Sequence, residues 1–374
     1  MRKLLAVAKK EPVLLIALAL GIGSFVLVPP SSKTIGFIDF KVLCCLASLM
    51  LCVSSLKAQK AFDKLAGFLL SKTRRPFPIA LILVGLCFFS SMLITNDVSL
   101  LTFVGFAIVL LPPSSGLLIP VIVLQTIAAN LGSTITVMGN PQNLYLCSYY
   151  DLTSLDLLRI MGPYAALSLA LLVLCCWLLT RGKDPIQTIE TVKEPISLYS
   201  LALSLSMFII SLLGVFKVLD YKLCLGIVSL SFFIQGLLDR KNGINIFKGI
   251  DWTLLLTFVG FFLFTGNLGS LEKVASWIRG ILEGHVLAVS LASSQALSNV
   301  PTALLLSSFT GEGASLLLGV NLGGLGTLIA SLASVISYKL YSQSEQAQGG
   351  RYMLVFTAYN AAFLVALLGL RILL

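Results

Sequence analysis

Residues 128–143, AANLGSTITVMGNPQN, interrupt a long apolar segment with Gly, Ser, Thr, Asn, Pro and Gln. A shorter run of the same character, VNLGGLGT, occupies residues 320–327 inside a second apolar segment. A helix in hydrocarbon breaks only where protein or a wet cavity satisfies the freed backbone groups, because lipid offers no water to them. Such breaks in both halves of a chain are typical of inverted repeats that form a binding site near the membrane midplane. The two runs therefore predict two broken membrane helices.

The composition indicates a polytopic membrane protein, because 57% of the 374 residues are hydrophobic, 11% are charged and the mean hydropathy is +0.98. The formal charge of +10 is carried by short loops, which predicts contact with the lipid bilayer and no nucleic-acid partner. Apolar runs of spanning length predict an all-α fold with about nine transmembrane helices. The predicted spans are 12–29, 38–56, 117–146, 160–180, 196–217, 221–238, 250–266, 314–339 and 352–373.

Two further apolar segments, 77–112 and 284–310, each carry a polar tip in the middle, which favours a re-entrant hairpin over a crossing. With both treated as hairpins and the N-terminus in the cytoplasm, the predicted inside segments hold 18 of the 26 Lys and Arg. This asymmetry satisfies the positive-inside rule and predicts a multi-pass protein of the inner, cytoplasmic membrane. The inside segments are 1–11, 57–76, 181–195, 239–249 and 339–351.

The spans and hairpins form two predicted inverted repeats. Each repeat contains helices, one hairpin and one broken helix, and an extra linking helix inverts the second copy. The first predicted repeat is residues 1–180, with hairpin 77–112 and broken helix 117–146. The second is residues 221–374, with hairpin 284–310 and broken helix 314–339. Residues 181–220 connect the two repeats and contain the linking helix. Aligning the breaks pairs Asn130 with Asn321, Leu131 with Leu322, Gly132 with Gly323 and Thr136 with Thr327.

The hairpin tips and the breaks carry side chains that can bind ions. Their amide and hydroxyl oxygens suit sodium, whereas their donors and the nearby helix N-termini suit an anion. Asp97 is the carboxylate expected deepest in the membrane, where it could carry the coupling ion or cap the second arm of its hairpin. The candidate substrate and ion ligands are Thr95, Asn96, Asp97, Asn130, Gly132, Thr134, Asn140, Gln142, Asn143, Ser298, Asn299, Thr302, Asn321, Gly323, Gly324 and Thr327, and the candidate sodium ligands are Ser91, Thr95, Asn96 and Asn299.

Other functions explain these features less well. Glycines can simply permit close helix packing, but packing does not require the polar tetrad 140–143, whose proline lacks a backbone donor. An enzyme is not expected, because the chain has one histidine and neither an HExxH nor a GxSxG motif. A passive channel stays open as an alternative, since broken helices also line pores.

The same residues resemble the Ion Transporter superfamily, in the branch that groups arsenite permeases, citrate and dicarboxylate permeases, and sodium/proton antiporters. The resemblance covers nearly the whole chain and implies an elevator-type permease whose two hairpin tips bind sodium and carboxylate. Both tips depart from that pattern in their third residue, where Asp97 introduces a charge and Val300 removes a hydroxyl. The matching motifs are TNDV at 95–98, NLGS at 130–133, GNPQNL at 139–144, SNVP at 298–301 and GVNLGG at 319–324.

Together these observations predict an ion-coupled secondary transporter without a cofactor, coupled to sodium or to protons. The predicted substrate is a small anion, either a di- or tricarboxylate or an inorganic oxyanion, and the predicted assembly is a homodimer. Sodium/proton exchange through Asp97 and arsenite efflux are the alternatives within the same family.

Overall fold

The computed structural model describes residues 12–31, 34–112, 115–186, 198–238, 249–344 and 347–373. Within these ranges the chain forms helices and no strand, which confirms the predicted all-α class. The contacts divide the chain into two units, and both halves of the sequence contribute to each unit. Unit 1 holds the described residues of Met1–Gln59, Ser197–Val289 and Pro301–Leu316, and unit 2 holds those of Lys60–Ile196, Ser290–Val300 and Leu317–Leu374.

Seven helices in the described ranges are long and apolar enough to cross a membrane, or up to eight if a bent pair counts as one span. Six of the nine predicted spans fall on these seven helices, and the other three fall on shorter apolar helices. The seventh long helix, Pro76–Ile94, is the first arm of the predicted hairpin 77–112. These findings confirm a polytopic membrane protein.

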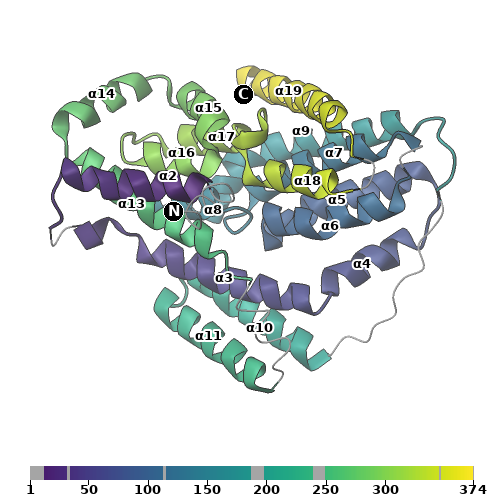
Figure 1. Ribbon diagram of the computed structural model, residues 1–374, viewed down its shortest axis with the longest axis horizontal. Helices are drawn as coiled ribbons and strands as arrows, with labels where there is room; N and C mark the ends of the chain where they lie inside the picture. The colour runs from purple at the N-terminus through teal and green to yellow at the C-terminus, as the bar shows by residue number, and fades with distance from the viewer. Residues whose placement is uncertain are drawn as a thin grey trace, which may run out of the picture. The chain divides into compact units, whose positions relative to one another are not determined.

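In unit 1, the backbones of helices α2 and α13 approach closely. A Cβ atom on Gly21 of α2 would lie 2.6 Å from the carbonyl oxygen of Gly260 on α13, so only glycine permits this crossing. Helix α3 lies beside α10 and α11 (Figure 1), and Ser55 and Ser204 share a buried hydrogen bond of 2.6 Å. The helices of this unit are α2 (Pro12–Gly23), α3 (Phe40–Ala58), α10 (Leu198–Val215), α11 (Tyr221–Leu238), α13 (Trp252–Gly269) and α14 (Glu272–Leu282), with short 3-10 turns at Ser24–Val26 and Thr34–Phe37.

Unit 2 contains both helix breaks. Helices α5 and α6 form a hairpin joined by a single residue, and α7 packs against both arms (Figure 1). Three helices are each divided between the two units: α15 (Val286–Leu297), α16 (Asn299–Ser307) and α17 (Gly313–Leu322). The other helices of unit 2 are α4 (Ala61–Leu70), α5 (Pro76–Ile94), α6 (Asn96–Leu110), α7 (Leu118–Gly132), α8 (Pro141–Tyr149), α9 (Ser154–Thr180), α18 (Leu332–Ser342) and α19 (Gly349–Leu373), with 3-10 turns at Ser133–Ile135 and Leu328–Ala330.

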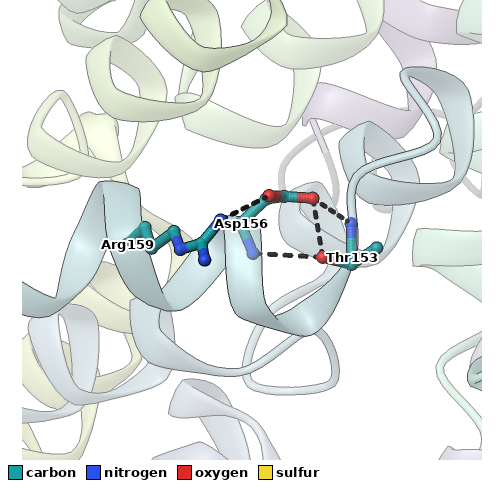
Figure 2. A network of polar contacts seen from close by, with 3 residues as sticks. All are labelled: Thr153, Asp156 and Arg159. Carbon is teal, nitrogen blue, oxygen red and sulfur yellow. Dashed lines mark hydrogen bonds and ion pairs between the residues drawn. The ribbon is translucent and has the colours of Figure 1, made fainter.

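The longest helix of unit 2, α9, begins with a capping box. Thr153 Oγ1 accepts the backbone N–H of Asp156, and the Asp156 carboxylate accepts the backbone N–H of Thr153 at 3.0 Å (Figure 2). Arg159 lies 3.9 Å from the same carboxylate on the exposed side of the first turn. The two reciprocal bonds satisfy donors that the helix end would otherwise leave free, so they fix where α9 starts after the first broken helix.

Candidate functional site

The first hairpin tip is the single strained residue Thr95, and it is followed by Asn96, whose polar groups are hydrogen-bonded. Thr95 joins α5 to α6 with φ 71° and ψ 153°, a region that residues with a side chain rarely adopt. Asn96 donates its backbone N–H to the carbonyl of Gly139 at 3.2 Å and its Nδ2 to Asn130 Oδ1 at 3.2 Å. Its Oδ1 accepts the backbone N–H of Asp97 at 3.1 Å. Both donors and the side-chain oxygen of Asn96 are therefore used within unit 2.

Asp97 lies in the first turn of α6 and is half-buried. The positive end of the helix dipole favours a carboxylate at this position. At this helix start the side-chain oxygen of Asn96, the residue before it, accepts the backbone N–H of Asp97.

The first helix break is held open by Asn143. Helix α7 ends at Gly132, a short 3-10 turn follows, and α8 begins after Asn140, whose Oδ1 accepts the backbone N–H of Asn143 at 2.8 Å. Asn143 Nδ2 lies within 3.1–3.3 Å of the carbonyl oxygens of Ser133, Thr134 and Thr136. A buried carbonyl without a partner is costly, so this one amide stabilises the interruption that the sequence predicts.

A second asparagine joins the two breaks. Asn321, near the end of α17, donates its Nδ2 to Asn143 Oδ1 at 2.8 Å and to the carbonyl of Leu317 at 2.9 Å. Its Oδ1 accepts from Asn140 Nδ2 at 3.2 Å and faces Gln142 Nε2 at 3.5 Å. The polar tetrad 140–143 thus meets the second broken helix through one buried side chain.

Asn130 makes the reciprocal contacts from α7 to the second half of the other broken helix. Its Oδ1 accepts from Ser331 Oγ at 2.9 Å, and its Nδ2 lies 3.4 Å from Ser334 Oγ. Adding 191 to the positions 130, 140 and 143 gives 321, 331 and 334, so the two sets of contacts follow one sequence offset. This is the offset at which the two breaks align in the sequence.

The second hairpin tip has the same backbone form as the first. Ser298 joins α15 to α16 with φ 76°, and its Oγ donates to the carbonyl of Ala330 at 3.3 Å. Asn299 Oδ1 accepts the backbone N–H of Val300 at 2.9 Å, as Asn96 Oδ1 accepts that of Asp97. The tips therefore share a positive φ and an asparagine that closes the first turn of the next helix.

The second break is held by a glutamine from the hairpin. Gln295 Nε2 donates to the carbonyls of Gly323 and Leu325, each at 2.9 Å. Gln295 Oε1 accepts the backbone N–H of Thr327 at 2.8 Å, and Thr327 Oγ1 donates to the backbone carbonyl of Gln295 at 2.9 Å. Gly326, with φ 114°, leaves the space that this side chain fills. The hairpin arm and the second break are thus directly bonded.

Two glycines let the hairpins pack on the broken helices. A Cβ atom on Gly132 would strike the carbonyl of Phe88 and lie 2.8 Å from Ser91 Oγ. A Cβ atom on Gly323 would lie 2.7 Å from Cβ of Ser294 and 2.8 Å from its Oγ. Gly132 and Gly323 are the glycines paired in the sequence alignment, and each serves close approach to its own hairpin.

The structure places most candidate residues in one unit, and it adds several that the sequence reasoning missed. Gly324 lies beside Asn299, Thr134 contributes a carbonyl to the first break, and the Ser91 hydroxyl donates to the carbonyl of Phe88. Thr302 is buried on α16 but belongs to unit 1. The residues missed are Ser133, Gln295, Ser331 and Ser334. When the alignment is extended, Ser331, which precedes α18, is paired with Asn140, and Ser334 in α18 is paired with Asn143.

Interrupted helices with buried amides at both breaks, inside an apolar multi-pass fold, are typical of membrane transporters. The sequence profile of a citrate transporter family matches residues 4–314, and the chain belongs to this family. An uncharacterized transporter of Methanocaldococcus jannaschii is 32% identical over 327 residues, 85% of each chain. The inner membrane protein YbiR of Escherichia coli is 29% identical over 339 residues, 87% of this chain and 86% of its own. An uncharacterized transporter of Mycobacterium tuberculosis is 24% identical over 71% of this chain and 66% of its own.

Proposed function

We propose that this protein is an ion-coupled secondary transporter that moves a small anion, either a carboxylate or an inorganic oxyanion. The observation that carries the proposal is the pair of helix breaks joined by Asn143 and Asn321. Interrupted helices supply backbone donors and acceptors at membrane depth, and buried amides add donors for an anion and oxygens for a cation. Membership of a citrate transporter family supports an anionic substrate.

We further propose that unit 2 is the moving part of an elevator-type transporter. Every candidate binding residue except Thr302 lies in unit 2, so the site could travel with this unit without being dismantled. The hydrogen bonds of Gln295, Asn143 and Asn321 connect the second hairpin and both breaks inside it.

The coupling ion is proposed to act at the first hairpin tip. Asp97 is half-buried there at a helix start, and Asn96 and Thr95 adjoin it. An ionisable group at membrane depth is expensive and is a functional candidate for that reason. The same placement favours sodium/proton exchange through Asp97 as the second candidate function.

The proposed setting is the cytoplasmic membrane, with the N-terminus in the cytoplasm and two copies per assembly. The positive-inside distribution of Lys and Arg supports the orientation, and the relative YbiR is named as an inner membrane protein. Cysteine labelling of loop positions in intact cells tests the orientation, and chemical crosslinking in membranes tests the dimer.

Thermal stabilisation of the purified protein tests the function. The panel contains dicarboxylates, citrate, sulfate, phosphate and arsenite, each with sodium and with potassium, because a ligand that binds the folded state raises the Tm. A shift that requires one anion together with sodium, or with a change of pH, supports coupled anion transport. Shifts with sodium or pH and no anion effect would support cation/proton exchange, and saturable uptake with counterflow separates a transporter from a channel.

A further inference from the structure

Five cationic residues from two distant segments form a basic surface on unit 2. They are Lys72, Arg74 and Arg75, between α4 and α5, and Arg181 and Lys183, after α9. The backbone N–H of Ile186 donates to the carbonyl of Arg74 at 2.9 Å, which holds the two segments together. All five residues are exposed, and none forms an ion pair within the part of the chain that the structure describes. Because like charges repel, a negatively charged partner would stabilise this surface.

Two of these cations lie over aromatic rings that the protein leaves about half exposed. Lys72 Nζ is 4.9 Å from the centre of the Phe68 ring, and Arg181 Cζ is 5.5 Å from that of Trp177. Phe68 is 59% exposed and Trp177 is 47% exposed. At a membrane surface such rings contact the acyl chains, while the neighbouring cations reach the headgroups.

Helix α4 has the character of a helix that lies along a membrane surface. Its residues Ala66 and Leu70 are buried, and the helix packs against both arms of the first hairpin. Leu65 is exposed on the same helix, as Phe68 is, and an acyl chain would cover such apolar residues. A Cβ atom on Gly116 would lie 3.9 Å from Lys183 Nζ, so the basic surface also reaches the loop between α6 and α7.

Helix α14 of unit 1 provides a contrast within the same chain. It is also amphipathic, and its Trp277 is exposed. Its cations Lys273 and Arg279 are balanced in number by Glu272 and Glu283. An exposed aromatic residue is therefore common to α4 and α14, whereas an excess of positive charge distinguishes the surface beside α4.

We propose that the basic surface of unit 2 binds an anionic phospholipid of the surrounding bilayer. The phosphate group lies among the five cations, and the acyl chains lie against Leu65, Phe68 and Trp177. Clusters of Lys and Arg beside a membrane helix are typical of surfaces that recognise anionic lipids. Because α4 packs against the first hairpin, the bound lipid stabilises the end of the hairpin away from its tip. This inference does not depend on the identity of the transported ion.

Stabilisation by added lipid tests the proposal. Purified protein in dodecyl maltoside is titrated with dioleoylphosphatidylglycerol or with dioleoylphosphatidylcholine, and the lipid concentration that gives half of the maximal rise in Tm is measured. We expect phosphatidylglycerol to act on the wild type at a concentration about tenfold lower than phosphatidylcholine. Arg74→Gln/Arg75→Gln should raise the phosphatidylglycerol concentration about tenfold or more, since each cation near an anionic surface contributes about fivefold in affinity. Arg74→Lys/Arg75→Lys keeps both charges and should stay within about threefold of the wild type.

Lys273→Gln/Arg279→Gln is the matched control, because it removes two cations from the amphipathic helix whose charges are balanced. It should leave the half-stabilising concentration within about threefold of the wild type. An equal loss in this control, or no difference between the two lipids in the wild type, would overturn the proposal. Stabilisation by inorganic phosphate that disappears in Arg74→Gln/Arg75→Gln would also overturn it, because the surface would then bind free phosphate.

Trp177 gives a second measurement if the glutamine variant does not fold. In Trp252→Phe/Trp277→Phe, Trp177 is the one remaining tryptophan. Phosphatidylglycerol with brominated acyl chains should quench its fluorescence about twofold more than brominated phosphatidylcholine at the same mole fraction, and 1 M NaCl should remove the difference by screening. Equal quenching by the two lipids would overturn the proposal and leave the proposed transport function unaffected.

Discussion

Asn321 Nδ2 lies 2.8 Å from Asn143 Oδ1, and this bond joins residues 178 positions apart in the sequence. Asn143 is fully buried and Asn321 is 2% exposed, so the bond is shielded from water. Each asparagine also satisfies backbone carbonyls of its own broken helix. The geometry of the first break therefore depends on that of the second, and a change in one is transmitted through these two amides.

Replacing either asparagine should show this dependence. Asn143→Ala and Asn321→Ala should each lower the free energy of unfolding by about 2 kcal/mol, since buried carbonyls lose their partner. The double variant should lose less than the sum, with a coupling energy of about 1 kcal/mol, typical of hydrogen bonds between membrane helices. Chemical denaturation in detergent measures the free energy of unfolding of the wild type, the two single variants and the double variant. If the losses of the two single variants simply added up in the double variant, a direct interaction would be contradicted.

Gln295 should control the conformation of the second break. Gln295→Met removes the hydrogen bonds of the Gln295 side chain to Gly323, Leu325 and Thr327. Methionine is chosen because Met92 stands three residues before the tip residue Thr95, as Gln295 stands three residues before Ser298. We expect amide hydrogen exchange across residues 323–327 to accelerate about tenfold or more, because these backbone groups become free to open. Gln295→Glu keeps the acceptor for Thr327 and should give an intermediate effect. Unchanged exchange in both variants would show that the glutamine does not hold the break.

Close packing at Gly132 should make alanine costly. The added methyl group would strike the carbonyl of Phe88, so Gly132→Ala should destabilise the protein by about 2 kcal/mol or more. Gly85→Ala is the matched control on the same hairpin, because no atom lies within 4 Å of its Cβ position. The control should fall within about 0.5 kcal/mol of the wild type. Thermal unfolding in detergent compares the two, and equal stabilities would contradict the observed approach of α7 to α5.

Asp97→Asn distinguishes coupling from capping. The amide has the same shape but no charge, so we expect the sodium or pH dependence of transport to disappear while the protein stays folded. A residue that only caps α6 would tolerate the amide and keep its ion dependence. Uptake into proteoliposomes at two pH values, with and without sodium, measures the difference.

The sequence predicts the helices and both breaks because their signals are local. Long apolar runs give the spans, and Gly, Pro and Asn within an apolar segment give the interruptions at 133–140 and 323–331. The alignment of Asn130 with Asn321 rests on a few letters, but the contacts of these asparagines follow the same offset.

The partners of those asparagines were not predictable in the same way. Serine in a helix usually bonds to the carbonyl four residues earlier, as Ser204 does with Ser200. Nothing in the pattern of residues distinguishes Ser331 or Ser334, which turn toward another helix, from serines that do not. Gln295 was missed for a related reason, since its acceptors are backbone atoms that leave no trace in the sequence.

Thr95 and Ser298 hold positive φ angles at the two tips although neither is glycine. Glycine at either position would remove steric strain and could raise the melting temperature, yet it would also release the backbone that orients Asn96 and Asn299. Selection for stability alone would therefore favour glycine at these two positions, and selection for activity would oppose it. The hydroxyl residues at the tips are therefore expected to lower resistance to heat while they hold the backbone that orients Asn96 and Asn299.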